Sequence, residues 1–418
     1  MKLISLFKNS FIYAGTEIIN KAVPFLLLPI MTHYLTPSDY GIVATYGAFI
    51  AILAIFIHLS MAGAVQVNYF KIPIENIKVY ITSVLMILSA TTFLALLLMT
   101  IFHSTLAYKL DIPDLWLFIG IAMVVAQLLT LINLVLWQVE QRAKPYGVYQ
   151  ILQMLTNASI GLTLVVGFGL NWEGQLIAQA ISTILFGFLS LAFVYRRGYL
   201  SFTFDIDYIK DALKFGVPLI PHALSGWFKT GIDRIFITTL VSTSATGLYS
   251  IGYQFGMIIG ILAVAFNQAY SPYLYKQLEH IDLQGKKNMV KFTYFYFFII
   301  LVLASLLSLL APWIVTYFLD VRYKESLAYI PLIAFSFAFS GMYFMVVNYI
   351  FYMKRTFYLA MVTFSVSLIH VGLSYLLIHK NGAIGAAQAT LLSSFLGFIA
   401  VWILSAKVYR MPWNLKSA

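Results

Sequence analysis

Residues 292–318 read FTYFYFFIILVLASLLSLLAPWIVTYF and contain no Asp, Glu, Lys or Arg. A helix that crosses the hydrocarbon core of a bilayer, about 30 Å thick, needs about 20 consecutive apolar residues. A segment this long and this apolar therefore predicts a membrane-spanning helix. The whole chain has the same character, since 61% of its 418 residues are hydrophobic and only 10% are charged.

This composition excludes several classes of protein. Soluble domains carry about 25% charged residues, and this chain has too few to cover a surface that faces water. Ordinary soluble enzymes, disordered chains and fibrous repeats are therefore excluded. The sequence contains no cysteine, which excludes disulfides and thiolate metal sites. It also lacks the phosphate-binding GxxxxGK[ST] motif and the HExxH motif, so we expect no cofactor and no metal ion.

Twelve segments along the chain are long and apolar enough to predict transmembrane helices. They cover residues 10–33, 40–66, 79–102, 115–137, 147–170, 174–195, 214–240, 246–269, 292–318, 328–352, 357–378 and 384–406. We therefore expect an all-α polytopic membrane protein with twelve transmembrane helices. The first segment continues through Glu17 and Lys21, so it is interpreted as an uncleaved span and not as a signal peptide.

Lysine and arginine are distributed unevenly between the two predicted sides of the membrane. Of the 26 Lys and Arg residues, 19 lie at the termini or in even-numbered connections, and only 4 lie in odd-numbered connections. Cytoplasmic loops are enriched in these residues, so both termini are expected in the cytoplasm. Most of the net charge of +11 lies in the loops, where it indicates membrane lipids as partners and no nucleic acid.

Similar residues recur in the two halves of the chain. An offset of 206 residues places Gly41 on Gly247, and each follows a short outward turn. Coincidence among glycine-rich apolar segments is the alternative explanation. Six spans in each half give both halves the same orientation in the membrane, so the repeat is predicted to be parallel. This organisation predicts two six-helix bundles, residues 1–200 and 201–418, around a central cavity, which is typical of transporters.

Four short motifs lie near the starts of the two halves. They read LTPSDYG at residues 35–41, ALKFGVPLIP at 212–221, DRIFI at 233–237 and TGLYS at 246–250. These motifs resemble those of bacterial polysaccharide flippases, the O-antigen or Wzx-type exporters of the multidrug/oligosaccharidyl-lipid/polysaccharide superfamily. The length of the chain and the predicted number of spans also match this family.

The resemblance implies a transporter of the bacterial cytoplasmic (inner) membrane and not an enzyme. Members of the family move undecaprenyl-pyrophosphate-linked oligosaccharide, such as the O-antigen unit of lipopolysaccharide, from the inner to the outer leaflet by alternating access. The resemblance also implies that the protein acts beside a polysaccharide polymerase and a chain-length regulator. It does not identify the sugar.

Five charged residues lie inside predicted spans, where charges are costly and are usually functional or paired. Glu17 and Lys21 lie in the first span. Lys229, Asp233 and Arg234 lie in the seventh. In each span the acid and the lysine are four residues apart, so each pair can neutralise itself on one helix face. Arg234 has no such partner, although its long side chain can also reach the outer interface.

In the light of the resemblance, the intramembrane charges indicate a site for the pyrophosphate of the lipid carrier. Arginine can donate two parallel hydrogen bonds to phosphate oxygens, and lysine attracts phosphate as a point charge. Lys21, Lys229 and Arg234 are therefore the predicted substrate-binding residues. Glu17 and Asp233 are predicted to serve in ion coupling or in charge pairing.

Two other functions remain open at this point. A cation-coupled multidrug or small-solute exporter of the same superfamily would share the predicted fold. For coupling, His58, His222 and His370 are alternative titrating groups, although such residues more often serve packing. A membrane enzyme, such as an O-antigen polymerase or ligase, needs a large outward loop, and the longest one predicted here, residues 102–115, is too short for a catalytic domain.

Prolines mark the opening helix of each predicted half. Pro24 and Pro29 lie in the first span, and Pro218 and Pro221 lie in the seventh. Proline removes a backbone donor from a helix, so these positions predict either bends used in alternating access or plain kinks. Between the halves, Asp207 is predicted to cap a short interfacial helix.

Overall fold

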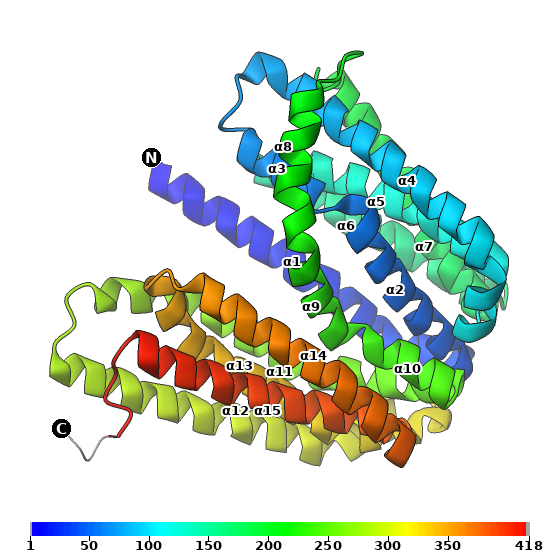
Figure 1. Cartoon of the computed structure of the whole chain (residues 1–418). Coiled ribbons are helices and arrows are strands. Elements are labelled where there is room, and N and C mark those ends of the chain that lie inside the picture. Colours follow the sequence, from blue (N-terminus) through cyan, green and yellow to red (C-terminus); the bar gives the residue numbers. More distant parts are fainter. Residues whose placement is uncertain (1, 415–418) are drawn as a thin grey trace. The chain divides into compact units, whose positions relative to one another are not determined.

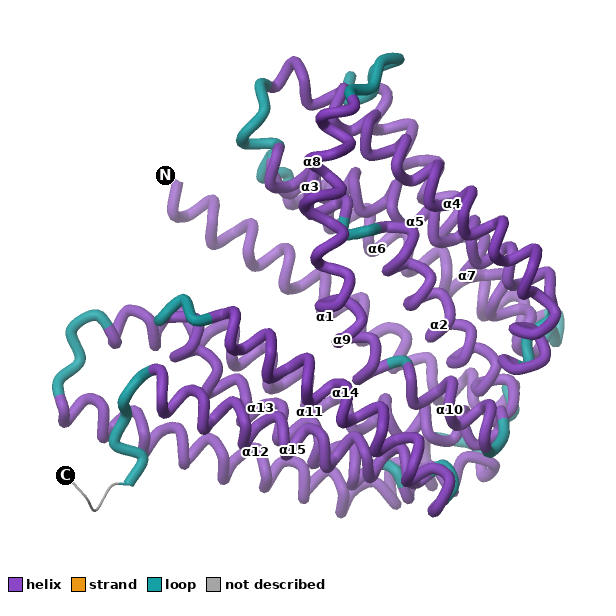
Figure 2. The backbone as a smooth tube through the Cα atoms, in the orientation of Figure 1, coloured by secondary structure: helices purple, strands orange, loops and turns teal. Residues whose placement is uncertain are grey.

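The structure is a computed structural model that describes residues 2–414. The side chains of residues 2–11, 14 and 21 are outside the described part, so the predicted site residue Lys21 lies outside the described side chains. Every regular element in residues 2–414 is a helix (Figure 2). The chain divides into two compact units, Met1–Trp227 and Phe228–Ala418.

The N-terminal unit consists of eight α-helices, a π-helical turn and a 3₁₀ turn, and the ninth helix leads out of it (Figure 1). These elements are α1 (Lys2–Tyr34), α2 (Pro37–His58), α3 (Met61–Asn68), α4 (Ile74–Leu110), α5 (Asp114–Val139), α6 (Ala143–Leu162), the π turn η1 (Thr163–Gly167), α7 (Asn171–Arg196), α8 (Ile206–Gly216), the 3₁₀ turn η2 (Val217–Leu219) and α9 (Ile220–Thr230).

The C-terminal unit begins at the end of α9 and is built from long helices with one 3₁₀ segment (Figure 1). Its elements are α10 (Ile232–Leu240), α11 (Thr243–Leu278), α12 (Leu283–Phe318), the 3₁₀ segment η3 (Val321–Ala328), α13 (Ile330–Tyr352), α14 (Thr356–Asn381) and α15 (Ile384–Val408).

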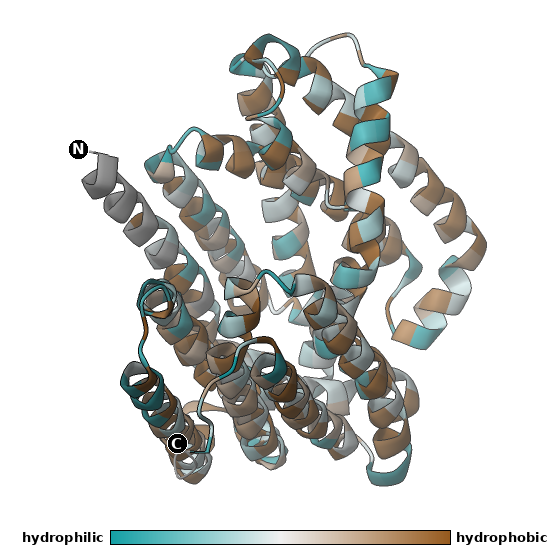
Figure 3. Cartoon of the chain, turned by 60° about the vertical axis from the view of Figure 1, so that its left-hand side comes forward, coloured by the Kyte–Doolittle hydropathy of each residue, from teal (hydrophilic) through white to brown (hydrophobic). Residues whose placement is uncertain are grey.

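Ten of the described helices are long and apolar enough to cross a membrane, and they coincide with ten of the predicted spans. The two predicted spans outside this set are the first, where α1 is one helix of 33 residues, and the seventh, which is divided into short helices. The long helices are mostly hydrophobic, and hydrophilic residues gather at the connections (Figure 3). The all-helical, multi-pass character expected from the sequence is confirmed.

The short turns that precede Gly41 and Gly247 cap the helices that follow them. Thr36 accepts a hydrogen bond from the backbone N–H of Asp39 at 3.2 Å, and the Asp39 carboxylate accepts one from the backbone N–H of Thr36 at 2.7 Å. This reciprocal pair, with Pro37 in the first turn, starts α2. In the second unit, Ser242 accepts a hydrogen bond from the backbone N–H of Ala245 and starts α11.

The boundary between the compact units lies after Trp227, later than the boundary predicted after residue 200. The reason is that α8 packs against α3 and α4 of the N-terminal unit. The Asp211 carboxylate of α8 accepts hydrogen bonds from Asn68 at 2.9 Å and from Tyr80 at 3.1 Å. The residue that caps α8 is Asp205, not the predicted Asp207, whose backbone N–H is the donor to the cap.

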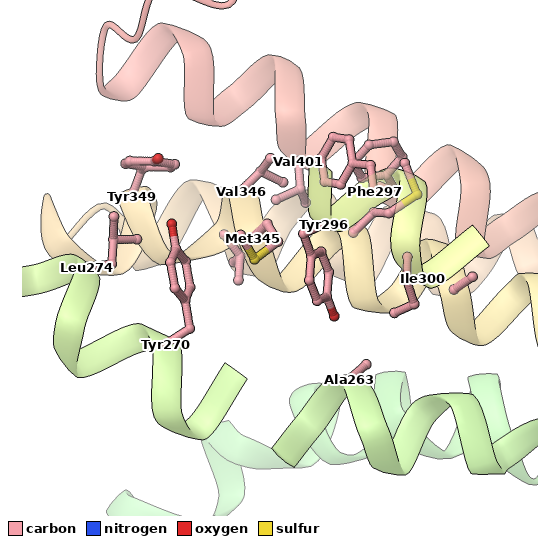
Figure 4. Packing of buried hydrophobic residues seen from close by; sticks show 14 of the residues in the cluster. Ala263, Tyr270, Leu274, Tyr296, Phe297, Ile300, Met345, Val346, Tyr349 and Val401 are labelled. Atoms are coloured by element: carbon pink, nitrogen blue, oxygen red, sulfur yellow. The ribbon is translucent and has the colours of Figure 1, made fainter. Parts of the chain in front are cut away.

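The core of the C-terminal unit lies between α11, α12, α13 and α15 (Figure 4). It contains large side chains that are almost fully buried, among them Leu274, Met345 and Tyr349. Helices gain little from hydrophobic association inside a bilayer, because lipid is as apolar as leucine. Close packing between side chains must therefore supply much of the stability of this core.

A row of glycines lets α11 approach α13 closely. Gly252, Gly256 and Gly260 are spaced four residues apart, so they lie on one face of α11. A Cβ atom added at Gly256 would lie 2.5 Å from Ile333 of α13, which is closer than real Cβ contacts. The contact brings the N-terminal part of α11 against α13, where both helices contribute side chains to the site described below.

Candidate functional site

The seventh predicted span is interrupted at Gly231, between α9 and α10. The interruption separates Lys229 at the end of α9 from Asp233 in the first turn of α10. Over the residues it describes, the structure shows no ion pair between Lys229 and Asp233. The self-neutralised pair considered for this span is therefore absent, because the single continuous helix it requires does not form.

Asp233 instead lies at the centre of a buried polar cluster. Its side chain is 1% exposed. One carboxylate oxygen, Oδ2, accepts hydrogen bonds from Tyr249 at 2.9 Å and from Thr390 at 3.0 Å. The other, Oδ1, accepts a hydrogen bond from Ser374 at 2.6 Å and lies 3.3 Å from Nε2 of His370. These partners come from α11, α14 and α15, so the carboxylate joins three helices to α10.

Burial makes this cluster energetically demanding. Moving an ionised carboxylate out of water costs several kcal/mol of hydration free energy, unless hydrogen-bond partners in the protein replace the lost water. Here three hydroxyl groups and an imidazole surround Asp233, which offsets that loss. The other ring nitrogen of His370, Nδ1, lies 3.0 Å from the hydroxyl of Ser393. The cluster therefore continues from Asp233 through His370 to α15.

A cavity of ≈ 270 Å³ lies beside this cluster, within the C-terminal unit. One lysine, several hydroxyl groups and several aromatic rings line it, together with apolar side chains. The polar and aromatic lining residues are Lys229, Thr230, Tyr253, Ser336, Phe337, Ser340, Tyr343, Phe344, Thr363, Thr390, Ser393, Ser394 and Phe398. Thr390 and Ser393 belong to both the cavity and the buried cluster, so the two adjoin.

Lys229 brings a positive charge to this cavity. Within the described part of the chain, its ammonium group has neither a carboxylate nor a hydrogen-bond partner. An ammonium in such a position attracts an anion, because no carboxylate among the described side chains offsets its charge. The predicted substrate-binding residue Lys229 therefore lies where an anionic group can reach it through the cavity.

Arg234 lies close to the same region through its contacts with two tyrosines. Its guanidinium carbon is 4.8 Å from the ring centre of Tyr253, which lines the cavity, and 5.9 Å from that of Tyr249. The guanidinium also donates a hydrogen bond to the backbone carbonyl of Thr230. Arg234 is half-buried, so it is held against aromatic faces at the end of α9 and does not extend freely away from the protein.

The remaining predicted site residues lie in the N-terminal unit. Glu17 on α1 is exposed. Near it, Asn20 donates a hydrogen bond to Gln150 of α6 at 3.0 Å, and Gln150 donates one to Tyr146 at 3.2 Å. These contacts place a polar seam between α1 and α6. Lys21 lies outside the described side chains.

The sequence interpretation named some members of the buried cluster and missed others. His370 was considered as a titrating group, whereas His58 contacts the backbone carbonyl of Val124, as a packing residue does. Tyr249 lies in the TGLYS motif but has no predicted site role, and Ser374 and Thr390 belong to none of the motifs. Ser374 follows His370 by one helical turn, and this spacing is the only signal in the sequence that could have indicated it.

Comparison with known proteins identifies relatives along most of the chain. The family described as polysaccharide biosynthesis protein matches residues 6–278. Two proteins of Haemophilus influenzae are similar: the Lsg locus putative protein 1, 25% identical, and an uncharacterized membrane protein, 27% identical. Each of these matches covers 84% of this chain and 85% of the relative.

Two groups of solved structures share the fold. The lipid II flippase MurJ, in an inward closed conformation, is similar with a TM-score of 0.76 and 16% identity, over 96% of this chain and 87% of that chain. An inward-facing multidrug resistance MATE family transporter of the MOP superfamily gives a TM-score of 0.59 and 13% identity, over 95% and 96% of the two chains. The family match extends over more than half of the chain, which confirms the resemblance drawn from its motifs: the chain belongs to the polysaccharide biosynthesis protein family and has the fold of MOP-type transporters.

Proposed function

We propose that the protein is a flippase that moves undecaprenyl-pyrophosphate-linked oligosaccharide, an O-antigen or similar surface polysaccharide unit, from the inner to the outer leaflet by alternating access. The observation that carries this proposal is the cavity that contains Lys229 without an acidic partner among the described residues. A pyrophosphate cannot cross hydrocarbon without compensation of its charge. A lysine that none of the described carboxylates neutralises supplies such compensation.

The other side chains of the cavity suit the rest of this cargo. Serine and threonine hydroxyls can exchange hydrogen bonds with sugar hydroxyls, because each is both a donor and an acceptor. Tyrosine and phenylalanine rings offer flat apolar faces to a sugar ring. Arg234, held against Tyr253, adds a second cation near the cavity. This combination suits a molecule that is anionic at one end and rich in hydroxyls at the other.

We further propose that the chain forms twelve spans in two six-helix bundles around a central cavity. The protein would lie in the bacterial inner membrane with both termini in the cytoplasm. Lys21, Lys229 and Arg234 bind the pyrophosphate, and Glu17 and Asp233 serve coupling or charge pairing. The protein carries out no reaction on its cargo and acts beside a polysaccharide polymerase and a chain-length regulator. The family and the fold of the chain support a transporter of this class.

A cation-coupled exporter of drugs or small solutes is the second candidate. The similarity of the fold to a multidrug resistance MATE family transporter favours it. Binding assays on the purified protein separate the two functions. Tight binding of a lipophilic cation that lipid pyrophosphates do not displace would favour the exporter.

Reconstitution into liposomes tests the flippase directly. Proteoliposomes would receive a fluorescent polyprenyl-pyrophosphate oligosaccharide in one leaflet, and a membrane-impermeant quencher would report its transfer. We expect transfer by the unaltered protein and a loss of about tenfold for Lys229→Ala, which corresponds to about 1.4 kcal/mol of binding. Lys324→Ala is the matched control, because Lys324 is an exposed residue of η3 outside the cavity. Equal transfer by both variants would contradict the role of Lys229.

A further inference from the structure

Polar and aromatic side chains on α13 continue beyond the cavity. Phe337 and Phe344 line the cavity, and Asn348 and Tyr352 follow Phe344 at successive turns of the helix. Spacings of seven and four residues place side chains on one face of a helix. The face of α13 that carries Phe344 to the cavity therefore continues with an amide and a tyrosine toward the end of the helix.

On α11, a matching row of side chains faces α13. Tyr253 lines the cavity, and Asn267 and Tyr275 come 14 and 22 residues after it, close to whole numbers of helical turns. Tyr253 lies edge-on to Phe337, with 5.4 Å between the ring centres. At the other end, Tyr275 stacks on Tyr352 with 6.2 Å between the ring centres. The two rows therefore contact each other at both ends.

Hydrogen bonds join the two rows between these aromatic pairs. Nδ2 of Asn348 donates to Oδ1 of Asn267 at 2.8 Å, and the hydroxyl of Tyr275 donates to Oδ1 of Asn348 at 3.3 Å. Asn348 is 2% exposed, so it is enclosed between the helices. The four residues beyond the cavity, Asn267, Tyr275, Asn348 and Tyr352, are called the α11–α13 track below.

One half of the Asn267 amide has no use within the protein. Its Oδ1 accepts from Asn348, whereas its Nδ2 has no hydrogen-bond partner among the described residues and is not enclosed. If both amides turned over, the same bond would run in the opposite direction, and the oxygen of Asn267 would be the free atom. In either orientation, one amide atom of Asn267 is available to a ligand.

A backbone acceptor lies beside this free amide atom. Pro272 lies inside α11 and has no N–H, so the carbonyl of Gln268, four residues earlier, loses its usual helical donor. Association between helices explains the bond from Asn348 to Asn267, but it leaves the free amide atom and this carbonyl unused. This part of α11 therefore offers hydrogen-bonding groups close to the aromatic face of Tyr275.

We propose that the α11–α13 track binds the sugar rings of the cargo that extend beyond the cavity. This inference rests on the proposed flippase function for the identity of the cargo. Sugar hydroxyls both donate and accept, so they suit either orientation of the Asn267 amide and the carbonyl of Gln268. The apolar C–H face of a sugar ring suits the rings of Tyr275 and Tyr352. Asn348 is a positioning residue, because it is enclosed and holds Asn267 and Tyr275 in place.

The length of the track makes it selective for long cargo. Along α13 the cavity extends from Ser336 to Phe344, and the track ends at Tyr352. The 16 residues from Ser336 to Tyr352 correspond to about 24 Å of helix. With its pyrophosphate in the cavity, a carrier with a single sugar does not reach the track, whereas a chain of several sugars does. The track therefore adds affinity only for a long oligosaccharide.

The first experiment measures transfer in proteoliposomes with two forms of the fluorescent polyprenyl-pyrophosphate carrier. One form has a single sugar ring, and the other has a sugar chain long enough to span about 24 Å. We expect Asn267→Leu and Tyr275→Phe to reduce transfer of the long form about three- to tenfold, the effect of one lost hydrogen bond. Transfer of the short form should be unchanged. An equal loss for both forms, or no loss for the long form, overturns the proposal.

Two further variants serve as controls in the same assay. Tyr273→Phe is matched to Tyr275→Phe, because Tyr273 is an exposed tyrosine of α11 that lies on another face of the helix, and it should transfer both forms normally. Lys229→Ala should reduce transfer of both forms, because both contain pyrophosphate. A loss for the long form in Tyr273→Phe as large as that in Tyr275→Phe would also overturn the track.

The second experiment measures binding and does not depend on transport. The long sugar chain, released from its carrier, is mixed with the full-length protein in detergent, and saturation-transfer NMR detects sugar protons that lie close to protein. We expect a signal from the unaltered protein and from Tyr273→Phe, and a weaker signal from Asn267→Leu and Tyr275→Phe. The absence of a signal from the unaltered protein overturns the track, even if the protein transfers lipid. A signal without transfer of either carrier supports the track and contradicts the flippase.

Tyr352→Leu keeps both tests decisive if the loss of a partner for Asn348 prevents folding of the other variants. Among the described residues, Tyr352 makes ring contacts with Tyr275 and Tyr409 but no hydrogen bond, so this variant leaves no polar group without its partner. We expect a several-fold loss for the long form alone and a weaker signal from the free sugar chain. Unchanged transfer and binding in Tyr352→Leu would overturn the proposed role of the aromatic faces.

Discussion

The first and seventh predicted spans look alike in sequence but differ in structure. Each contains an acid and a lysine four residues apart, and each contains two prolines. The first forms α1, a single helix of 33 residues that continues through Pro24 and Pro29. The seventh is divided into η2, α9 and α10, with an interruption at Gly231.

This difference decides what the two acids contact. Glu17, on the continuous helix, is exposed, whereas Asp233, just after the interruption, is buried among side chains of α11, α14 and α15. Spacing along one helix shows which residues share a face. It does not show whether that face meets other helices. The contrast teaches that the partner of an intramembrane charge is set by tertiary packing, and mutations of both spans can test it.

The largest expected effect is the loss of stability in Asp233→Ala. The change leaves His370 and three hydroxyl groups without their shared partner, and each buried polar group left unsatisfied costs about 1–3 kcal/mol. Thermal unfolding of the purified protein in detergent measures it. Glu17→Ala is the corresponding change in the first span, and because Glu17 is exposed we expect a shift within about 0.5 kcal/mol. Equal unfolding temperatures for the two variants would refute the contrast.

Two glycines give the next largest difference. Gly256→Ala places a Cβ atom 2.5 Å from Ile333, so α11 and α13 must separate. Overpacking of this kind costs about 1–3 kcal/mol. Gly15→Ala on α1 meets no atom within 4 Å, and alanine favours a helix over glycine by up to about 1 kcal/mol. The two substitutions should therefore shift the unfolding temperature in opposite directions, and a shift in the same direction would contradict this account of the packing.

The charges themselves are tested by the display of surface polysaccharide in cells. We expect Arg234→Ala and Lys21→Ala to reduce display about tenfold, the effect of losing about 1.4 kcal/mol of binding to the pyrophosphate. Arg322→Ala is the control, because Arg322 on η3 already donates to Asp320 at 2.8 Å. Equal display in all three variants would remove the role proposed for the intramembrane cations.

Much of the fold could be predicted because its signals are local. A long apolar segment specifies a span by itself, and the LTPSDYG motif contains both members of the cap that starts α2. The buried cluster could not be predicted in the same way. Ser374 and Thr390 are 141 and 157 residues away from Asp233 in sequence.

Hydroxyl residues in apolar helices carry little information about their partners. Each can donate to a carbonyl of its own helix, as Thr390 does to Ala386 at 2.9 Å. Such residues therefore occur in many spans without a tertiary role, and the sequence does not show which of them turn toward a distant carboxylate. The contacts that assign α8 to the N-terminal unit are also distant in sequence, because Asp211 is more than one hundred residues away from Asn68 and Tyr80. The sequence therefore does not show where the unit ends.

The smallest expected effects concern the prolines, and they test the cause of the interruption. Pro29 lies inside α1, where it removes a backbone donor, so Pro29→Ala should raise stability. We expect less than the about 3 kcal/mol that proline costs inside a soluble helix, because transmembrane helices tolerate proline. Pro221 is the second residue of α9 and follows a 3₁₀ turn, where a missing donor matters less. Thermal unfolding of Pro221→Ala should therefore differ little from that of the unaltered protein. A larger gain from Pro221→Ala than from Pro29→Ala would mean that proline, and not the contacts of Asp233 beyond Gly231, divides the seventh span.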